Sequence, residues 1–135
     1  MTAPRYLIEE LLGRYAWAHD ERDFDALAEL FTEDARYEMR VKGGESHEQV
    51  GPVAIVGQIR EFKERYTEQR RHVITNFRYD EETEDRAVVR SYLTVLHIGA
   101  DRIDVVTAGI YRDEVVLRDG RWRIVAKSLE LEHGF

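Results

Sequence analysis

Apolar residues near the start of the chain recur at helical spacing. They fall at i, i+3, i+4 and i+7, which predicts one amphipathic helix with a stripe formed by Ile8, Leu11, Leu12, Tyr15 and His19. Pro4 suits the first turn of this helix, because its missing N–H needs no partner there. After the polar stretch 19–23, apolar residues between Phe24 and Phe31 predict a second, short helix with Asp23 as its cap.

The rest of the pattern predicts a strand, a third helix and then a sheet. Residues 35–41 form the first expected strand, and a turn follows at 42–45. The third helix is expected from Gly51-Pro52 to about Gln69. From Arg71 onward, alternation predicts long antiparallel strands near 71–80, 86–98, 103–117 and 121–132, the last two joined by a tight Asp-Gly turn. This order of elements predicts one α+β domain spanning residues 1–135, with its helices on one face of the sheet.

The long strands carry apolar residues on both faces. In the strand near 86–98, Leu93 and Tyr92 point to opposite sides of the sheet. Three helices do not suffice to cover both faces, so a second subunit is the simplest cover for the other one. We therefore expect a homodimer or homotrimer that buries the outer face, with Val73 and Phe77 on it.

Composition narrows the class of protein. The 135 residues include 20 Lys+Arg against 27 Asp+Glu, and a net charge of −7 argues against nucleic-acid binding. The absence of cysteine excludes disulfides, cysteine-ligated metals and thiol catalysis. No apolar run approaches the roughly 18 residues of a membrane helix, and Glu9 and Glu10 stand where a signal peptide would be apolar. These features predict a soluble, cytoplasmic protein that does not bind membranes.

Asp20 and His72 are the leading candidates for chemistry. Asp20 lies at the C-terminal end of the first helix, where the helix dipole disfavours a carboxylate by a few tenths to about 1 kcal/mol. His72 begins the first long strand on the same face as Ile74, within reach of that helix end. A carboxylate partner would fix the imidazole tautomer and raise its basicity. Two interpretations stay open at this point: a catalytic general base, or a buried histidine with a purely structural role.

Several aromatic residues provide polar tips for a cavity. Tyr15 is a candidate catalytic hydroxyl, and the candidate substrate-binding residues are Trp17, His19, Tyr37, Tyr66 and Tyr92. An apolar cavity lined by a few polar groups is typical of small-molecule sites, although each aromatic residue would also suit an ordinary core position. The histidines include no H-x-H or H-x-x-x-H pair, so we expect no metal site.

Longer segments carry a resemblance to a known family. RYAWAHDERDFDALAELFTEDARY at 14–37, RRHVITNF at 70–77 and GIYRDEVVLRDGRWRIVAKSLELE at 109–132 together resemble the SnoaL-like branch of the nuclear transport factor 2 superfamily. The resemblance covers nearly the whole chain. It implies a cone-shaped α+β fold, in which a curved, mainly antiparallel sheet wraps around N-terminal helices and a central pocket.

Two enzymes of that superfamily are similar in the candidate segment, scytalone dehydratase and hexachlorocyclohexane dehydrochlorinase. Both use an Asp–His dyad, and Asp20 and His72 occupy the matching positions. The resemblance implies a cofactor-independent lyase or isomerase, of the dehydratase or cyclase type, acting on a small, apolar, cyclic substrate. In that interpretation His72 takes a proton, Asp20 orients the imidazole, and Tyr15 or Tyr37 polarises the substrate.

A second resemblance points to a different class. The segments RHVITN and GRWRIVAKSLELE are also similar to the small β subunit of aromatic-ring-hydroxylating dioxygenases, a mainly structural partner of a catalytic subunit. A non-catalytic ligand-binding module belongs to the same alternative. A buried Asp20–His72 contact that opens on a cavity favours the enzyme, whereas a filled interior favours the subunit.

Overall fold

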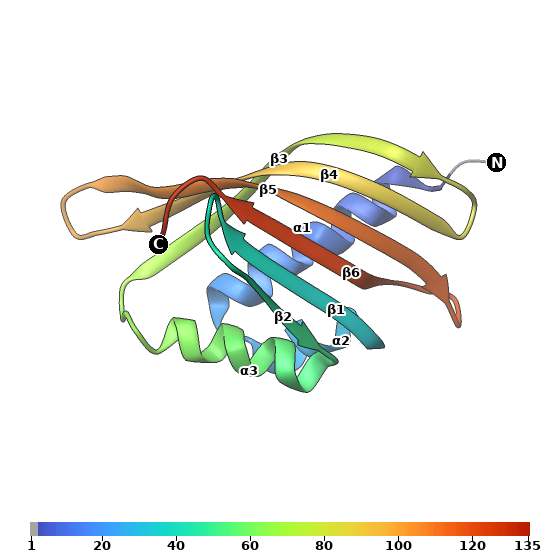
Figure 1. The fold of residues 1–135 in the computed structure, drawn as a ribbon, viewed down its shortest axis with the longest axis horizontal. Helices are drawn as coiled ribbons and strands as arrows, with labels where there is room; N and C mark the ends of the chain where they lie inside the picture. Colours follow the sequence, from blue (N-terminus) through green and yellow to red (C-terminus); the bar gives the residue numbers. More distant parts are fainter. Residues whose placement is uncertain (1–2) are drawn as a thin grey trace.

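The helices lie on one side of a strongly curved sheet in the computed structural model, which describes residues 3–135 (Figure 1). Within these residues the elements are α1 (Arg5–Glu21), α2 (Phe24–Glu29), β1 (Phe31–Val41), β2 (Ser46–Val50), α3 (Pro52–Lys63), β3 (Gln69–Glu82), β4 (Arg86–Ile98), β5 (Ile103–Arg118) and β6 (Arg121–Leu131). The strand order is β2-β1-β6-β5-β4-β3, and among these neighbours only the pair β1–β6 is parallel. The expected α+β fold with a curved, mainly antiparallel sheet is confirmed.

The end of α1 is fixed in place by its own sequence. Arg22 adopts the left-handed conformation that ends the helix, and the Asp23 carboxylate accepts the backbone N–H of Ala26 at 3.2 Å, as the sequence predicted for a cap. The Arg22 guanidinium donates to the carbonyl oxygens of Lys63 and Tyr66, both at 2.9 Å. The last turn of α1, which carries Asp20, is thereby tied to the end of α3.

Two boundaries and one strand differ from the sequence prediction. The third helix ends at Lys63, well before Gln69, and Phe31 begins a strand instead of ending a helix. The strand β2 was missed altogether. Its sequence SHEQV holds one apolar residue, and four of its five residues are exposed on an edge strand, so no alternation marks it.

A bulge in β3 changes which side chains face the helices. Asn76 has a φ of 57°, and the pairing of β3 with β4 shifts register between Thr75 and Arg78. His72 therefore faces the helices before the bulge, and Phe77 packs against the same core after it. The prediction that Phe77 lies on the outer face is wrong, because it assumed an uninterrupted alternation.

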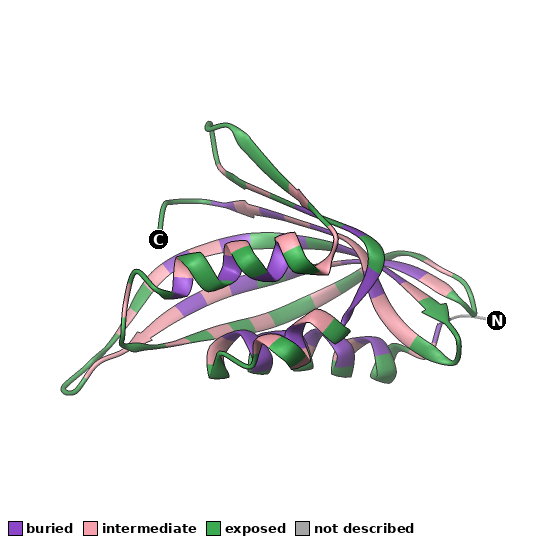
Figure 2. Cartoon of the chain, turned by 90° about the horizontal axis from the view of Figure 1, so that it is seen from below, coloured by how far each residue is buried: buried purple, intermediate pink, exposed green. Residues whose placement is uncertain are grey.

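The core lies between the helices and the concave face of the sheet (Figure 2). On the opposite face, Val73, Tyr92 and Ile110 are exposed by 38%, 54% and 40%, with Tyr92 and Ile110 directly paired across β4 and β5. Across residues 3–135, every helix is too short or too polar to span a bilayer.

Candidate active site

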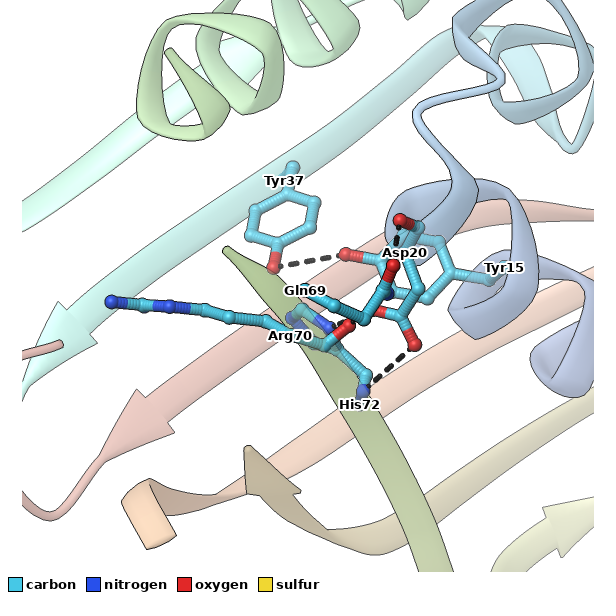
Figure 3. Close-up of polar contacts among 6 residues, drawn as sticks. All are labelled: Tyr15, Asp20, Tyr37, Gln69, Arg70 and His72. Carbon is cyan, nitrogen blue, oxygen red and sulfur yellow. Dashed lines mark hydrogen bonds and ion pairs between the residues drawn. The ribbon is translucent and has the colours of Figure 1, made fainter. Parts of the chain in front are cut away.

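Asp20 and His72 contact each other through two hydrogen bonds (Figure 3). The Nδ1 atom of His72 lies 2.6 Å from Oδ1 of Asp20, and the backbone N–H of His72 donates to Oδ2 at 2.9 Å. The side chain of His72 is 9% exposed and that of Asp20 is 12% exposed. Because Nδ1–H donates to the carboxylate, the ring presents Nε2 as its free proton acceptor.

The environment keeps His72 in its neutral form. Burial lowers the pKa of His72 below its ordinary value of 6.5, and the hydrogen bond and charge of Asp20 oppose that shift only in part. The imidazole is therefore mostly unprotonated at neutral pH. A neutral, oriented imidazole is the form that a general base requires.

His19 lies directly beside His72 but is not part of the hydrogen-bonded pair. The two ring centroids are 4.0 Å apart, and Nδ1 of His19 has no hydrogen-bond partner within residues 3–135. Burial, followed by the charge of His72, holds the pKa of His19 well below 6.5. His19 thus adds a second neutral imidazole to the cavity wall.

Tyr15 and Tyr37 form a chain of hydroxyl groups. The Tyr15 hydroxyl donates to that of Tyr37 at 3.3 Å, and of the two only Tyr37 lines the cavity. Burial raises the pKa of Tyr37 to about 12 and that of Tyr15 well above 10, so both groups stay protonated. Because Tyr37 accepts from Tyr15, its own O–H remains available to donate into the cavity.

The cavity itself is mostly apolar and narrow. It has a free volume of about 50 Å³, and its lining includes His19, Tyr37, Met39, Ile59, Tyr66, Arg70, His72, Leu93, Tyr111 and Leu129. That volume holds a few water molecules, whereas a bound drug-sized ligand fills roughly 300 Å³ or more. Phe62 and Phe135 also line it, with ring centroids 5.2 Å apart. A cyclic ligand therefore requires such lining side chains to move.

The structure brings together some of the predicted binding residues and separates others. His19, Tyr37 and Tyr66 line the cavity with His72. Trp17 and Tyr92 do not: their exposed fractions are 71% and 54%. Trp17 lies two helical positions beyond Tyr15 and so points about 200° away from it, while Tyr92 is next to the cavity residue Leu93 in a strand and points to the other face.

The dyad also forms part of a second, open groove between α1 and β3. This groove has a volume of about 560 Å³, and Trp17, Asp20, His72 and Phe77 are among its lining residues. His72 lines both spaces, so the dyad forms part of the wall between the cavity and the surface groove.

Three of these groups could together hold a metal ion. Donor atoms of His19, Asp20 and His72 lie within 4.8 Å of one another, a cluster that sequence spacing missed because α1 and β3 are far apart in the chain. Two features oppose this use. Nδ1 of His72 is already bonded to Asp20, and the charge of Lys63 lowers the pKa of both histidines, so it would also repel a divalent ion.

Sequence reasoning also missed two cations near the cavity. The Arg70 guanidinium lies 3.9 Å from the centre of the Tyr66 ring, and Lys63 is buried beside the same ring. The position of Arg70 offered a signal, because it lies two residues before His72 and so faces the same side of the strand.

A curved six-stranded sheet that encloses a cavity beneath its helices, with an Asp–His pair in the cavity wall, defines a domain of the nuclear-transport-factor-2-like, cystatin-like fold. The chain belongs to the SnoaL-like domain family, whose model matches residues 2–127.

Similar solved structures agree with this fold. A protein from Catenulispora acidiphila in complex with S-DNPA is 30% identical, with a TM-score of 0.80 over 95% of this chain and 92% of that one. An NTF2-like protein with a cystatin-like fold from Novosphingobium aromaticivorans is 24% identical, with a TM-score of 0.78 over 97% and 83%. The β subunit of a candidate aromatic-ring-hydroxylating dioxygenase from the same organism is 15% identical, with a TM-score of 0.80 over 96% of this chain and 90% of that one. No protein with curated annotation matches the chain significantly.

Proposed function

We propose that this protein is a cofactor-independent lyase or isomerase that removes a proton from a small cyclic substrate, with dehydration as the leading reaction. The observation that carries the proposal is the neutral imidazole of His72, oriented by Asp20, in the wall of an apolar cavity. The resemblance of the Asp20–His72 arrangement to the dyads of scytalone dehydratase and hexachlorocyclohexane dehydrochlorinase supports the same reaction class.

The proposed reaction begins with proton transfer to His72. Nε2 accepts a proton from a carbon next to a carbonyl group, and the C–H electron pair moves into an enolate. Asp20 stabilises the imidazolium that forms, while the Tyr37 hydroxyl donates to the carbonyl oxygen. In a dehydration, the electron pair then forms a carbon–carbon double bond as the β-hydroxyl group leaves. That group takes the proton back from the imidazolium and departs as water.

A simple β-hydroxyketone tests this proposal. In D₂O, the protein should accelerate both deuterium exchange at C2 of 3-hydroxycyclohexanone, followed by NMR, and its conversion to cyclohexenone, followed by absorbance. His72→Ala should lower both rates by about a hundredfold or more, because it removes the base. His47→Ala is the matched control, since His47 is an exposed residue of the edge strand β2.

Melting temperature and rate must be measured on the same preparations. If His72→Ala melts much earlier than the wild type but its folded fraction exchanges C2 at the normal rate, the pair is structural and the proposal is wrong. The same outcome would favour the alternative, a non-catalytic subunit of the dioxygenase β type or a ligand-binding module. Support for that alternative comes from the similar segments RHVITN and GRWRIVAKSLELE and from likeness to two solved structures, a candidate aromatic ring hydroxylase at 28% identity and the β subunit of a candidate aromatic-ring-hydroxylating dioxygenase at 15% identity.

We also propose that a second copy of the chain covers the outer face of the sheet, as a homodimer or homotrimer. The exposed apolar side chains of Val73, Tyr92 and Ile110 support it, because they share one face opposite the helices. Sedimentation at micromolar concentration should show an oligomer, and Tyr92→Glu should shift it towards monomer. A wild-type protein that sediments only as monomer would refute this assembly.

A further inference from the structure

Three cations surround the ring of Tyr66 beside the cavity. The Arg70 guanidinium lies 3.9 Å from the ring centre, and the Arg22 guanidinium and the Lys63 ammonium each lie 5.6 Å from it. Within residues 3–135, no carboxylate lies within ion-pair distance of any of the three. The Arg22 guanidinium donates to two backbone carbonyl groups. The side chains of Lys63 and Arg70 donate no hydrogen bond to a carbonyl group of residues 3–135.

Lys63 is buried, and Arg70 is half-buried. Lys63 is 1% exposed, and burial lowers its pKa to about 8, with the charge of Asp20 opposing the shift and those of Arg22 and Arg70 adding to it. The Nε atom of Arg70 is buried without a hydrogen-bond partner. Cations held in this way are costly unless an anion or acceptor meets them.

A second buried lysine, Lys127, shows how such a charge is ordinarily satisfied. Lys127 is fully buried, and its Nζ atom donates to Oδ1 of Asp113 at 2.8 Å. The protein as a whole carries a net charge of −7, so carboxylates are abundant. The cations around Tyr66 lie next to a cavity and have no carboxylate partner in residues 3–135. This arrangement therefore points to an anion that comes from outside the chain.

We propose that Arg70, assisted by Lys63, binds a carboxylate group of the substrate. This inference rests on the proposed function, since it names the class of substrate for the same cavity. Of the two cations, Arg70 is the one that lines the cavity, and its planar guanidinium donates two parallel hydrogen bonds to a carboxylate.

The position of Arg70 also orients the substrate. Arg70 and His72 lie on the same face of β3 with Cα atoms about 7 Å apart, and the Arg70 side chain extends away from the dyad (Figure 3). A substrate anchored at Arg70 would hold its carboxylate at one end and present a carbon from its other end to His72. The favoured substrate is thus a cyclic acid whose reacting carbon is separated from its carboxylate by several bonds.

Benzoate and benzamide test this site, because they share the same ring and differ in charge. By NMR titration, the wild-type protein should bind benzoate about tenfold more tightly than benzamide. Arg70→Met should remove that preference while leaving benzamide affinity unchanged. Arg71→Met is the matched control, since Arg71 is the next residue, carries the same charge, and lies outside the cavity lining. Arg70→Lys, which keeps the charge, should retain part of the preference.

The result is independent of catalysis. His72→Ala should lower the rate of proton exchange by about a hundredfold or more and keep the preference for benzoate. Failure of the proposed reaction is therefore distinguishable from failure of the anion site. The site is wrong if the wild type binds the two probes equally or binds neither. It is also wrong if the preference survives in Arg70→Met, or if Arg71→Met removes it equally.

Discussion

Residues 3–135 hold two buried pairs of a carboxylate and a nitrogen base, Asp113–Lys127 and Asp20–His72, and the two pairs have different surroundings. Asp113 and Lys127 are both 0% exposed, and the ammonium lies 4.1 Å and 3.9 Å from the ring centres of Tyr15 and Tyr111. Asp20 and His72 are almost as buried, and their contact of 2.6 Å is even shorter. The difference is that His72 lines the cavity, whereas neither member of the Asp113–Lys127 pair does.

This comparison shows that a buried acid–base pair is not by itself a sign of catalysis. In the sealed pair, the ammonium is held by one carboxylate and two aromatic faces, so no substrate can reach it. In the Asp20–His72 pair, one imidazole nitrogen is occupied and the other is free for a proton from a ligand. The sealed pair should therefore govern stability, and the cavity pair should govern reactivity.

The largest effect is expected from Lys127→Met. This change leaves the Asp113 carboxylate buried without its cation, which costs about 3–5 kcal/mol in unfolding free energy. Denaturant unfolding measures this loss. The double variant Asp113→Asn with Lys127→Met should regain much of it, because no buried charge remains. A single variant that loses less than about 1 kcal/mol would contradict the structural role of the sealed pair.

Asp20→Asn is expected to have a smaller effect than Lys127→Met. It should lower the rate of the proposed reaction more than the free energy of unfolding. An amide in place of the carboxylate removes the charge that stabilises the imidazolium and weakens the preference for one tautomer, but it keeps the base itself. Deuterium exchange at C2 of 3-hydroxycyclohexanone should slow by about tenfold, which corresponds to about 1.4 kcal/mol in activation free energy. His72→Ala is the reference for a larger loss. If Asp20→Asn destabilises the fold as much as Lys127→Met does, the two pairs do not differ in role.

The sequence predicted the cavity pair more readily than the sealed pair for a physical reason. Asp20 and His72 lie at the ends of a helix and a strand, where a polar residue interrupts an apolar pattern and demands a partner. Asp113 and Lys127 lie in the interior of two strands, where a charged residue near others such as Arg112, Glu114 and Arg123 looks like part of an ordinary solvent-facing side. Their direct pairing across β5 and β6 depends on the register of the sheet, which sequence alone does not fix.

The same limit explains the errors in the predicted fold and site. Helix spacing and the Asp119-Gly120 turn are local signals, so α1 and the last hairpin were predicted well. The face to which Phe77 points depends on one residue, Asn76, whose positive φ shifts the alternation. The absence of Trp17 from the cavity lining follows from its angle to Tyr15 on the helix, which turns it towards the open groove that Asp20 and His72 also line.

The smallest effect concerns the response of the cavity region to acid. The pKa of His19 is well below 6.5 and that of His72 is also lowered, so the unfolded chain binds more protons than the folded one as pH falls below 6.5. Stability present above pH 6.5 is therefore lost on acidification, and His19 alone should account for about 1 kcal/mol between pH 6.5 and 5.5. His19→Phe keeps a ring beside His72 without a titrating group, so its unfolding free energy should fall less steeply over that interval. Denaturant unfolding of the wild type and of His19→Phe at both pH values measures the difference. An unchanged slope in His19→Phe would mean that His19 titrates in the folded protein as it does in the unfolded chain, and that this side of the cavity is open to water.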